Sequence, residues 1–134
     1  MPTLTRWFIK TALVYFILAL IAGIISAVSN LPGLFPVYIH LLVEGWITLL
    51  IIGVVIWMFP KYSRELPRGN EKLGWTSYIL LNTGLVLRLV SEPLNTLGEA
   101  PESLWGVLLV ISAILQWLGG MAFVVNTWSR VKVK

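Results

Sequence analysis

Four long apolar stretches constrain the fold more than any other feature of this sequence. Each approaches or exceeds the about 20 residues that an α-helix needs to span a bilayer. The first stretch lacks a small-residue cleavage site, so we expect a retained helix and not a signal peptide. Short loops make successive helices antiparallel neighbours. The sequence therefore predicts an all-α, integral membrane four-helix antiparallel bundle, a single transmembrane domain over 1–134, with helices at about 7–29, 36–59, 75–92 and 104–128.

The composition agrees with a lipid environment. Hydrophobic residues make up 57% of the chain and charged residues 12%, whereas a soluble domain carries about 25% charged residues. The chain has no cysteine, which excludes a disulfide framework and a thiolate metal site. We expect the lipid bilayer to surround the domain.

Basic residues lie almost entirely on one side of the predicted membrane. With four spans, nine of the ten Lys and Arg residues fall on the side of the two termini, and Arg88 is the exception. The other side carries Glu92, Glu99 and Glu102. The positive-inside rule then predicts a multi-pass protein of the inner (cytoplasmic) membrane with both termini cytoplasmic. Because the basic residues are spread over three membrane-flanking segments, we expect no nucleic-acid partner.

Ionisable residues inside the predicted spans indicate a functional site. His40, the only histidine, lies at the outer end of the second span with Glu44 one turn deeper, and Arg88 and Glu92 end the third span on the same side. Such residues are costly in a membrane and usually functional. Each also has an ordinary explanation: Arg88 can snorkel, Glu92 can sit in a solvated loop and His40 can bond a carbonyl. An unpaired Glu44 is harder to explain, so we expect it to pair with Arg88 or His40 or to carry a proton.

Small and polar residues predict close contacts between helices. The ridge Ala19, Gly23 and Ala27 allows a close approach, either of another helix or of a flat macrocycle, and Gly45 and Gly53 mark close packing on the second span. Asn82 of the third span and Ser112 and Gln116 of the fourth are expected to form hydrogen bonds between helices. No complete catalytic centre is recognisable within one chain, so enzymatic activity is uncertain.

Three segments resemble a known membrane protein family. They are the run HLLVEGWITL at 40–49 with Gly53 and Phe59-Pro60, the run LNTGLVLRLVSEP at 81–93 and the run FVVNTWSR at 123–130. These segments are similar to the catalytic subunit of heme-copper oxidases, in particular its C-type and NO-reductase-like branch, and to short relatives of that subunit. The chain looks like one four-helix unit of that subunit standing alone, so the resemblance implies self-assembly.

The resemblance also implies a cofactor. In that family, the histidine at the position of His40 is an axial ligand of the low-spin heme. We therefore expect His40 to ligate the iron of heme b, Arg88 to bind a heme propionate, and Glu44 and Gly45 to line the cofactor site. The further histidines of an oxygen-reducing centre are missing, so the chain is not an oxygen reductase alone. Electron transfer or redox or gas sensing in a homo-oligomer, dimer or trimer, is the expected function, and its redox partner is unknown.

Two alternatives remain open. The first is a non-heme metal-binding or structural membrane module, in which His40 and Glu44 form an i, i+4 ligand pair at an oligomer interface. The second is a small transporter-like oligomer in which Glu44 is a proton-coupled carboxylate.

Overall fold

Four long helices form the whole architecture of the described chain. The computed structural model describes residues 1–98 and 102–131, without the side chains of Glu102 and Ser103. Three of the charged residues that define the predicted orientation, Glu99, Lys132 and Lys134, lie outside the described residues. The elements are α1 (Thr3–Val28), α2 (Leu34–His40), η1 (Leu41–Thr48), α3 (Leu49–Met58), α4 (Glu71–Leu97) and α5 (Glu102–Trp128). Because α2, η1 and α3 are continuous, they make one rod, and the predicted all-α four-helix bundle is confirmed.

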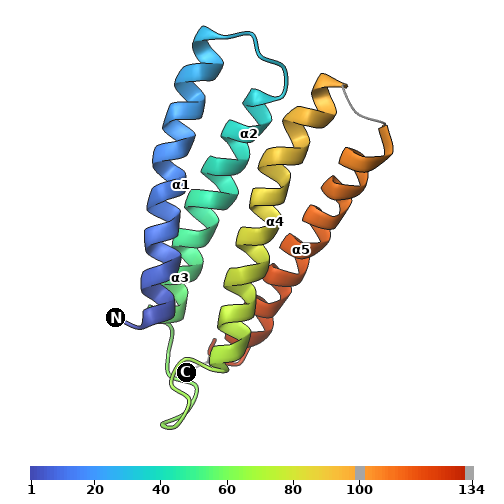
Figure 1. Ribbon diagram of the computed structural model, residues 1–134. Helices are drawn as coiled ribbons and strands as arrows, with labels where there is room; N and C mark the ends of the chain where they lie inside the picture. The colour runs from blue at the N-terminus through green and yellow to red at the C-terminus, as the bar shows by residue number, and fades with distance from the viewer. Residues whose placement is uncertain (99–101, 132–134) are drawn as a thin grey trace.

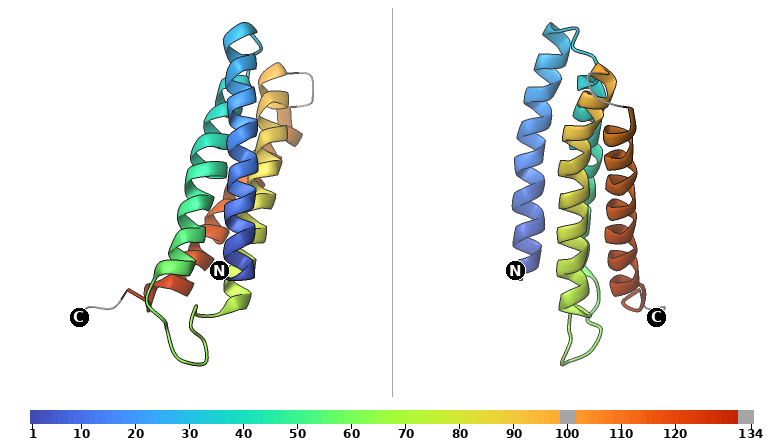
Figure 2. Two further views of the ribbon diagram at one scale, coloured as in Figure 1. Left: turned by 90° about the vertical axis from the view of Figure 1, so that its left-hand side faces the viewer. Right: turned by 45° about the vertical axis from the view of Figure 1, so that its right-hand side comes forward.

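The rods run side by side with alternating direction (Figures 1 and 2). Four helices of the described chain are long and apolar enough to cross a membrane, from 25 to 27 residues each. The N-terminus, the end of α5 and the loop between α3 and α4 lie at one end of the bundle, which we call the terminal end. The opposite end, with the loop 29–33 and the last turns of α4, is the distal end.

Helix α1 packs against the rod of α2, η1 and α3, and α4 packs against α5. The α1 residues that face the neighbouring helices recur every three or four positions, which makes one continuous stripe; they are Thr5, Phe8, Ala12, Tyr15, Ala19 and Ala22. Helix α4 also contacts α2 and η1. These contacts bring α4 against the part of the second rod that holds His40.

Helix α4 extends past its predicted end. The sequence predicts that the helix ends at 92, before Pro93, but it continues to Leu97 and ends at Gly98, whose positive φ of 66° is typical of a helix C-terminus. Proline removes one backbone hydrogen bond from a helix interior. Hydroxyl groups stabilise this region, since Thr96 Oγ1 donates to the Glu92 carbonyl at 2.9 Å. The extension keeps Glu92 within the helix.

Two of the three polar residues for which the sequence predicts hydrogen bonds between helices form them. Tyr15 of α1 donates its hydroxyl to Asn82 Oδ1 on α4 at 3.0 Å. Ser112 of α5 donates to the Gly84 carbonyl on α4 at 2.8 Å. Gln116 instead bonds within its own helix, to Ser112 Oγ at 3.4 Å. The roles predicted for Asn82 and Ser112 are confirmed, whereas Gln116 makes its hydrogen bond inside α5.

The small-residue ridge of α1 is only partly used for packing. Ala19 is fully buried, and a Cβ at Gly23 would lie 3.0 Å from the Tyr38 ring of the same chain. Ala27 is exposed. The ridge therefore serves contact within the chain at its first two positions.

Gly45 is a point of close approach between the second rod and α1. A Cβ at this position would lie 2.9 Å from Cβ and Cγ of Tyr15 and 3.2 Å from Leu85 Cδ2. We expect Gly45→Ala to destabilise the bundle by about 1–3 kcal/mol, the usual cost of overpacking a core. Unfolding in detergent by denaturant titration measures this loss. Gly120→Ala is the matched control, because a Cβ there meets nothing within 4 Å; equal stability of both variants would contradict the prediction.

Candidate functional site

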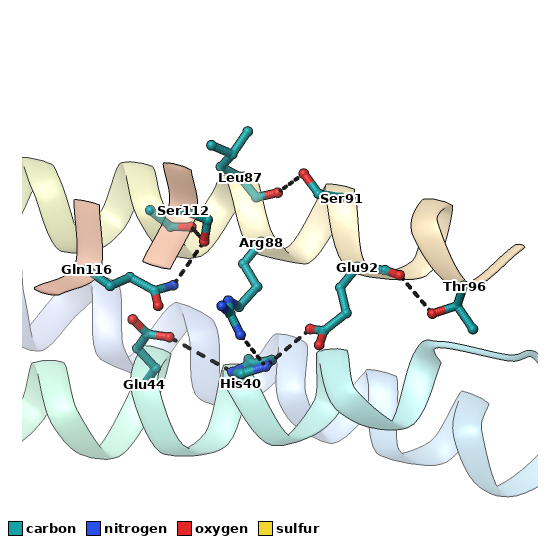
Figure 3. Close-up of polar contacts among 10 residues, drawn as sticks. His40, Glu44, Leu87, Arg88, Ser91, Glu92, Thr96, Ser112 and Gln116 are labelled. Carbon is teal, nitrogen blue, oxygen red and sulfur yellow. Dashed lines mark hydrogen bonds and ion pairs between the residues drawn. The ribbon is translucent and has the colours of Figure 1, made fainter. Parts of the chain in front are cut away.

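Four ionisable side chains meet toward the distal end of the bundle. His40 ends α2, Glu44 lies in η1, and Arg88 and Glu92 extend from α4 toward His40 (Figure 3). We call these four residues the charged cluster. His40 lies six residues after the start of α2, which places it roughly 9 Å along the helix axis. The sequence prediction that these residues converge is therefore confirmed by their contacts.

His40 is the centre of the charged cluster. Its Nε2 lies 3.1 Å from Glu92 Oε2 and 3.4 Å from Arg88 Nη1, and its Nδ1 lies 4.0 Å from Glu44 Oε2. The His40, Glu44 and Glu92 side chains are 26%, 18% and 22% exposed. Both ring nitrogens thus face charged groups of the same chain. The tautomer decides which of these groups can share a hydrogen bond with the ring.

Arg88 reaches across to the second rod. Its Nη1 contacts His40, and among the described residues its Nε is buried without a hydrogen-bond partner. The sequence prediction allowed a contact with Glu44, but no Arg88–Glu44 ion pair within 4.0 Å occurs in the described chain. His40 instead contacts both residues, Arg88 through Nε2 and Glu44 through Nδ1. Arg88 does contact the cluster, through the histidine.

Glu92 is a cluster member whose role the sequence left open between a loop and a site. Its Oε2 is buried and approaches His40 without the geometry of a hydrogen bond. Spacing carries the signal that identifies it, because Glu92 follows Arg88 by four residues and both share one face of α4.

A π-helical segment holds Glu44 and Gly45. The segment η1 covers eight residues, and the Thr48 hydroxyl donates to the Val43 carbonyl at 2.8 Å. Its buried residues Leu41 and Gly45 and the following Leu49 are four positions apart. Residues at this spacing share one helix face, which here packs against the neighbouring helices. Segments of π-helix frequently occur at functional sites, and this one is next to the charged cluster.

The contacts of the charged cluster show whether its residues fit heme or a non-heme metal, the two cofactors that the sequence suggests. An axial histidine must direct one nitrogen at the iron, but Arg88 and Glu92 hold the space at Nε2 and Glu44 lies beside Nδ1. Gly45 faces Tyr15 and Leu85, so its open side is filled by protein. The residues as placed do not fit heme ligation by His40. In the described chain, no three His, Asp or Glu side chains form a metal-binding group either, since the two carboxylates approach opposite nitrogens of the ring.

A proton fits the charged cluster. With both carboxylates ionised, Arg88 positive and His40 neutral, the net charge is −1. An uncompensated charge is costly away from water. One proton, carried by His40 or by a carboxylate, makes the cluster neutral. The arrangement can therefore take up and release one proton between groups already in contact.

Arg130, at the terminal end, is a buried cation whose burial the sequence does not predict. The sequence indicates only a basic residue that flanks the membrane, but the residue is 1% exposed. Its guanidinium donates to the carbonyls of Pro60, Ile56 and Phe59 at 3.1, 3.0 and 2.9 Å. It thus caps the C-terminus of α3, where unpaired carbonyls and the helix dipole favour a cation. Burial lowers the pKa of Arg130, although arginine stays charged in proteins.

Comparison of the chain with protein-family models, with curated proteins and with solved structures finds no match.

Proposed function

We propose that this chain is a proton-conducting membrane protein in which the charged cluster is the proton-binding site. The observation that carries the proposal is the contact of His40 with Arg88, Glu92 and Glu44 inside an apolar bundle. Chains of Asp, Glu and His within membrane spans are typical of proton relays. The excess negative charge of the cluster supplies a reason to bind one proton, and the partial exposure of its side chains supplies access.

We also propose an orientation and an assembly. The concentration of Lys and Arg at the terminal end supports a cytoplasmic-membrane protein with both termini in the cytoplasm, so that the charged cluster opens toward the outer side. The resemblance of the chain to one four-helix unit of a larger subunit supports a homo-oligomer. Native mass spectrometry from detergent measures the assembly, and a monomer would contradict it.

Heme b ligation by His40 stays a prediction from the resemblance. It requires that Arg88 and Glu92 both leave the space around Nε2. Purified protein, expressed with heme supplementation, tests it by absorption spectroscopy. A Soret band that is lost in His40→Ala would favour heme over the proton-binding function. A shared metal site at an interface between copies likewise stays a prediction, and elemental analysis of the oligomer tests it.

Glu44→Gln is expected to reduce proton flux to the level of empty vesicles. The amide keeps the shape of the side chain but can neither be ionised nor hold an exchangeable acidic proton. The measurement uses proteoliposomes with a potassium diffusion potential and an internal pH-sensitive dye. Glu65→Gln is the matched control, since Glu65 is exposed in the loop between α3 and α4. Wild-type flux in Glu44→Gln would overturn the proposed role of Glu44.

A further inference from the structure

A second set of polar side chains lies between α1 and α4, closer to the terminal end than the charged cluster. Thr11 Oγ1 and the Tyr78 hydroxyl are 2.7 Å apart. The Tyr15 hydroxyl donates to Asn82 Oδ1 at 3.0 Å, and Asn82 Nδ2 donates to the Tyr78 carbonyl at 2.8 Å. We call these four residues the polar ladder. Its members come from helices that contact each other little elsewhere, and they supply three hydroxyl groups in the bundle interior.

The polar ladder and the charged cluster occupy one face of α4. Tyr78, Asn82, Arg88 and Glu92 follow one another with Leu85 at spacings of three or four residues, and such residues share a helix face. From Tyr78 to Glu92 the helix rises by about 21 Å, most of the about 30 Å thickness of a bilayer core. Polar groups thus line the interior along most of the distance that a proton must travel, with one interruption.

Leu85 is that interruption. It is 1% exposed and lies between Asn82 and Arg88 on α4. Its Cδ2 approaches Gly45, next to Glu44, and the Tyr15 side chain packs on the same glycine. Leu85 and Tyr15 therefore pack together on Gly45, at the point where the polar ladder ends and the charged cluster begins. Hydrophobic constrictions of this kind stop ions by excluding water.

We propose that the polar ladder is the second half of the proton path and that Leu85, seated on Gly45, is the gate between the two halves. The inference rests on the proposed function of the charged cluster. A proton leaving Glu44 is accepted by the Tyr15 hydroxyl oxygen, and the Tyr15 hydroxyl releases its own proton to water, which carries it to the paired hydroxyl groups of Tyr78 and Thr11. Asn82 does not carry the proton; it is a positioning residue that orients Tyr15. Water fills the contact at Leu85 when that side chain moves.

Truncation of the gate tests the proposal. In proteoliposomes with a potassium diffusion potential, Leu85→Ala is expected to raise the proton flux several-fold above wild type. Leu81→Ala is the matched control, because Leu81 is also buried on α4 but faces Gly119 of α5. Leu85→Ala with Glu44→Gln is expected to return to the level of empty vesicles. A flux in Leu85→Ala that equals that of wild type or of Leu81→Ala would overturn the gate.

Removal of hydroxyl groups tests the polar ladder without creating a cavity. Tyr78→Phe and Tyr15→Phe are each expected to lower the flux several-fold at unchanged helix content by circular dichroism. Tyr38→Phe is the control, since the Tyr38 hydroxyl makes no hydrogen bond in the described chain. If Glu44→Gln abolishes flux while both ladder variants match wild type, the ladder is not the path but the proposed function stands. If neither wild type nor Leu85→Ala exceeds empty vesicles, the chain does not conduct protons by itself, and both the proton-conducting function and the gate are wrong.

Discussion

Arg130→Met is expected to cause the largest loss of stability of any single substitution at the terminal end. The guanidinium satisfies three carbonyls of the α3 C-terminus and its following residues, at 2.9–3.1 Å. A hydrogen bond to a charged group contributes about 1.5–3 kcal/mol, and contributions of this kind are not additive. We expect the free energy of unfolding to fall by about 3–6 kcal/mol. Unfolding of the purified protein in mixed detergent micelles measures the loss.

Two variants make this test specific. Arg64→Met removes an equal charge from an exposed position in the loop between α3 and α4 and is expected to leave stability within the error of the measurement. Arg130→Lys retains the charge but loses the planar fork that reaches several carbonyls, so we expect only partial recovery. If Arg130→Met were as stable as Arg64→Met, the capping role would be refuted.

The apolar stretches predicted the four helices because length and hydropathy decide membrane insertion, and neither depends on tertiary contacts. Helix ends were less predictable. The end of α4 was placed before Pro93, yet the helix continues, because local hydroxyl groups and contacts with the second rod outweigh one lost hydrogen bond. The π-helical turn at Glu44 was not predicted, since a widened turn depends on what the helix packs against.

The candidate site was predicted as a set of residues but not as a set of contacts. Topology alone brings His40, Glu44 and Arg88 to one end of the bundle. Which of them touch depends on rotation of the helices about their axes, and the π-helical segment changes that rotation by widening a turn. Gly45 illustrates the same limit. The sequence indicated a close approach there, and the structure shows that Tyr15 and Leu85 are what approach it.

The burial of Arg130 cannot be predicted from the sequence for a different reason. Its position, two residues after α5, made it one more member of a basic membrane-flanking set. Its burial follows from the arrangement of α3 beside the end of α5, which no local pattern in the sequence specifies. The same charge that indicates topology thus also caps a helix.

Arg88→Met is expected to make the stability of the bundle strongly dependent on pH. Without the guanidinium, Glu44 and Glu92 give the charged cluster a net charge of −2 when His40 is neutral, and neutrality then needs two protons in place of one. The folded state of the variant therefore binds more protons than the unfolded state at neutral pH. Stability falls with rising pH whenever the folded state binds more protons. We expect Arg88→Met to approach wild-type stability near about pH 5 and to lose stability toward about pH 8.

The size of the effect follows from burial, and a second substitution separates charge from packing. Removing one partner of a fully buried pair costs about 3–5 kcal/mol; because the cluster side chains are about a quarter exposed, we expect about 2–4 kcal/mol near pH 8. Arg88→Met with Glu92→Gln restores the wild-type net charge of −1 and is expected to recover most of the loss. Thermal unfolding in detergent over the pH range measures both variants, with Arg6→Met, at an exposed position of α1, as the control. A loss in Arg88→Met that is the same at all pH values and is not recovered by Glu92→Gln would mean that Arg88 only packs against His40, and the charge balance proposed for the cluster would be wrong.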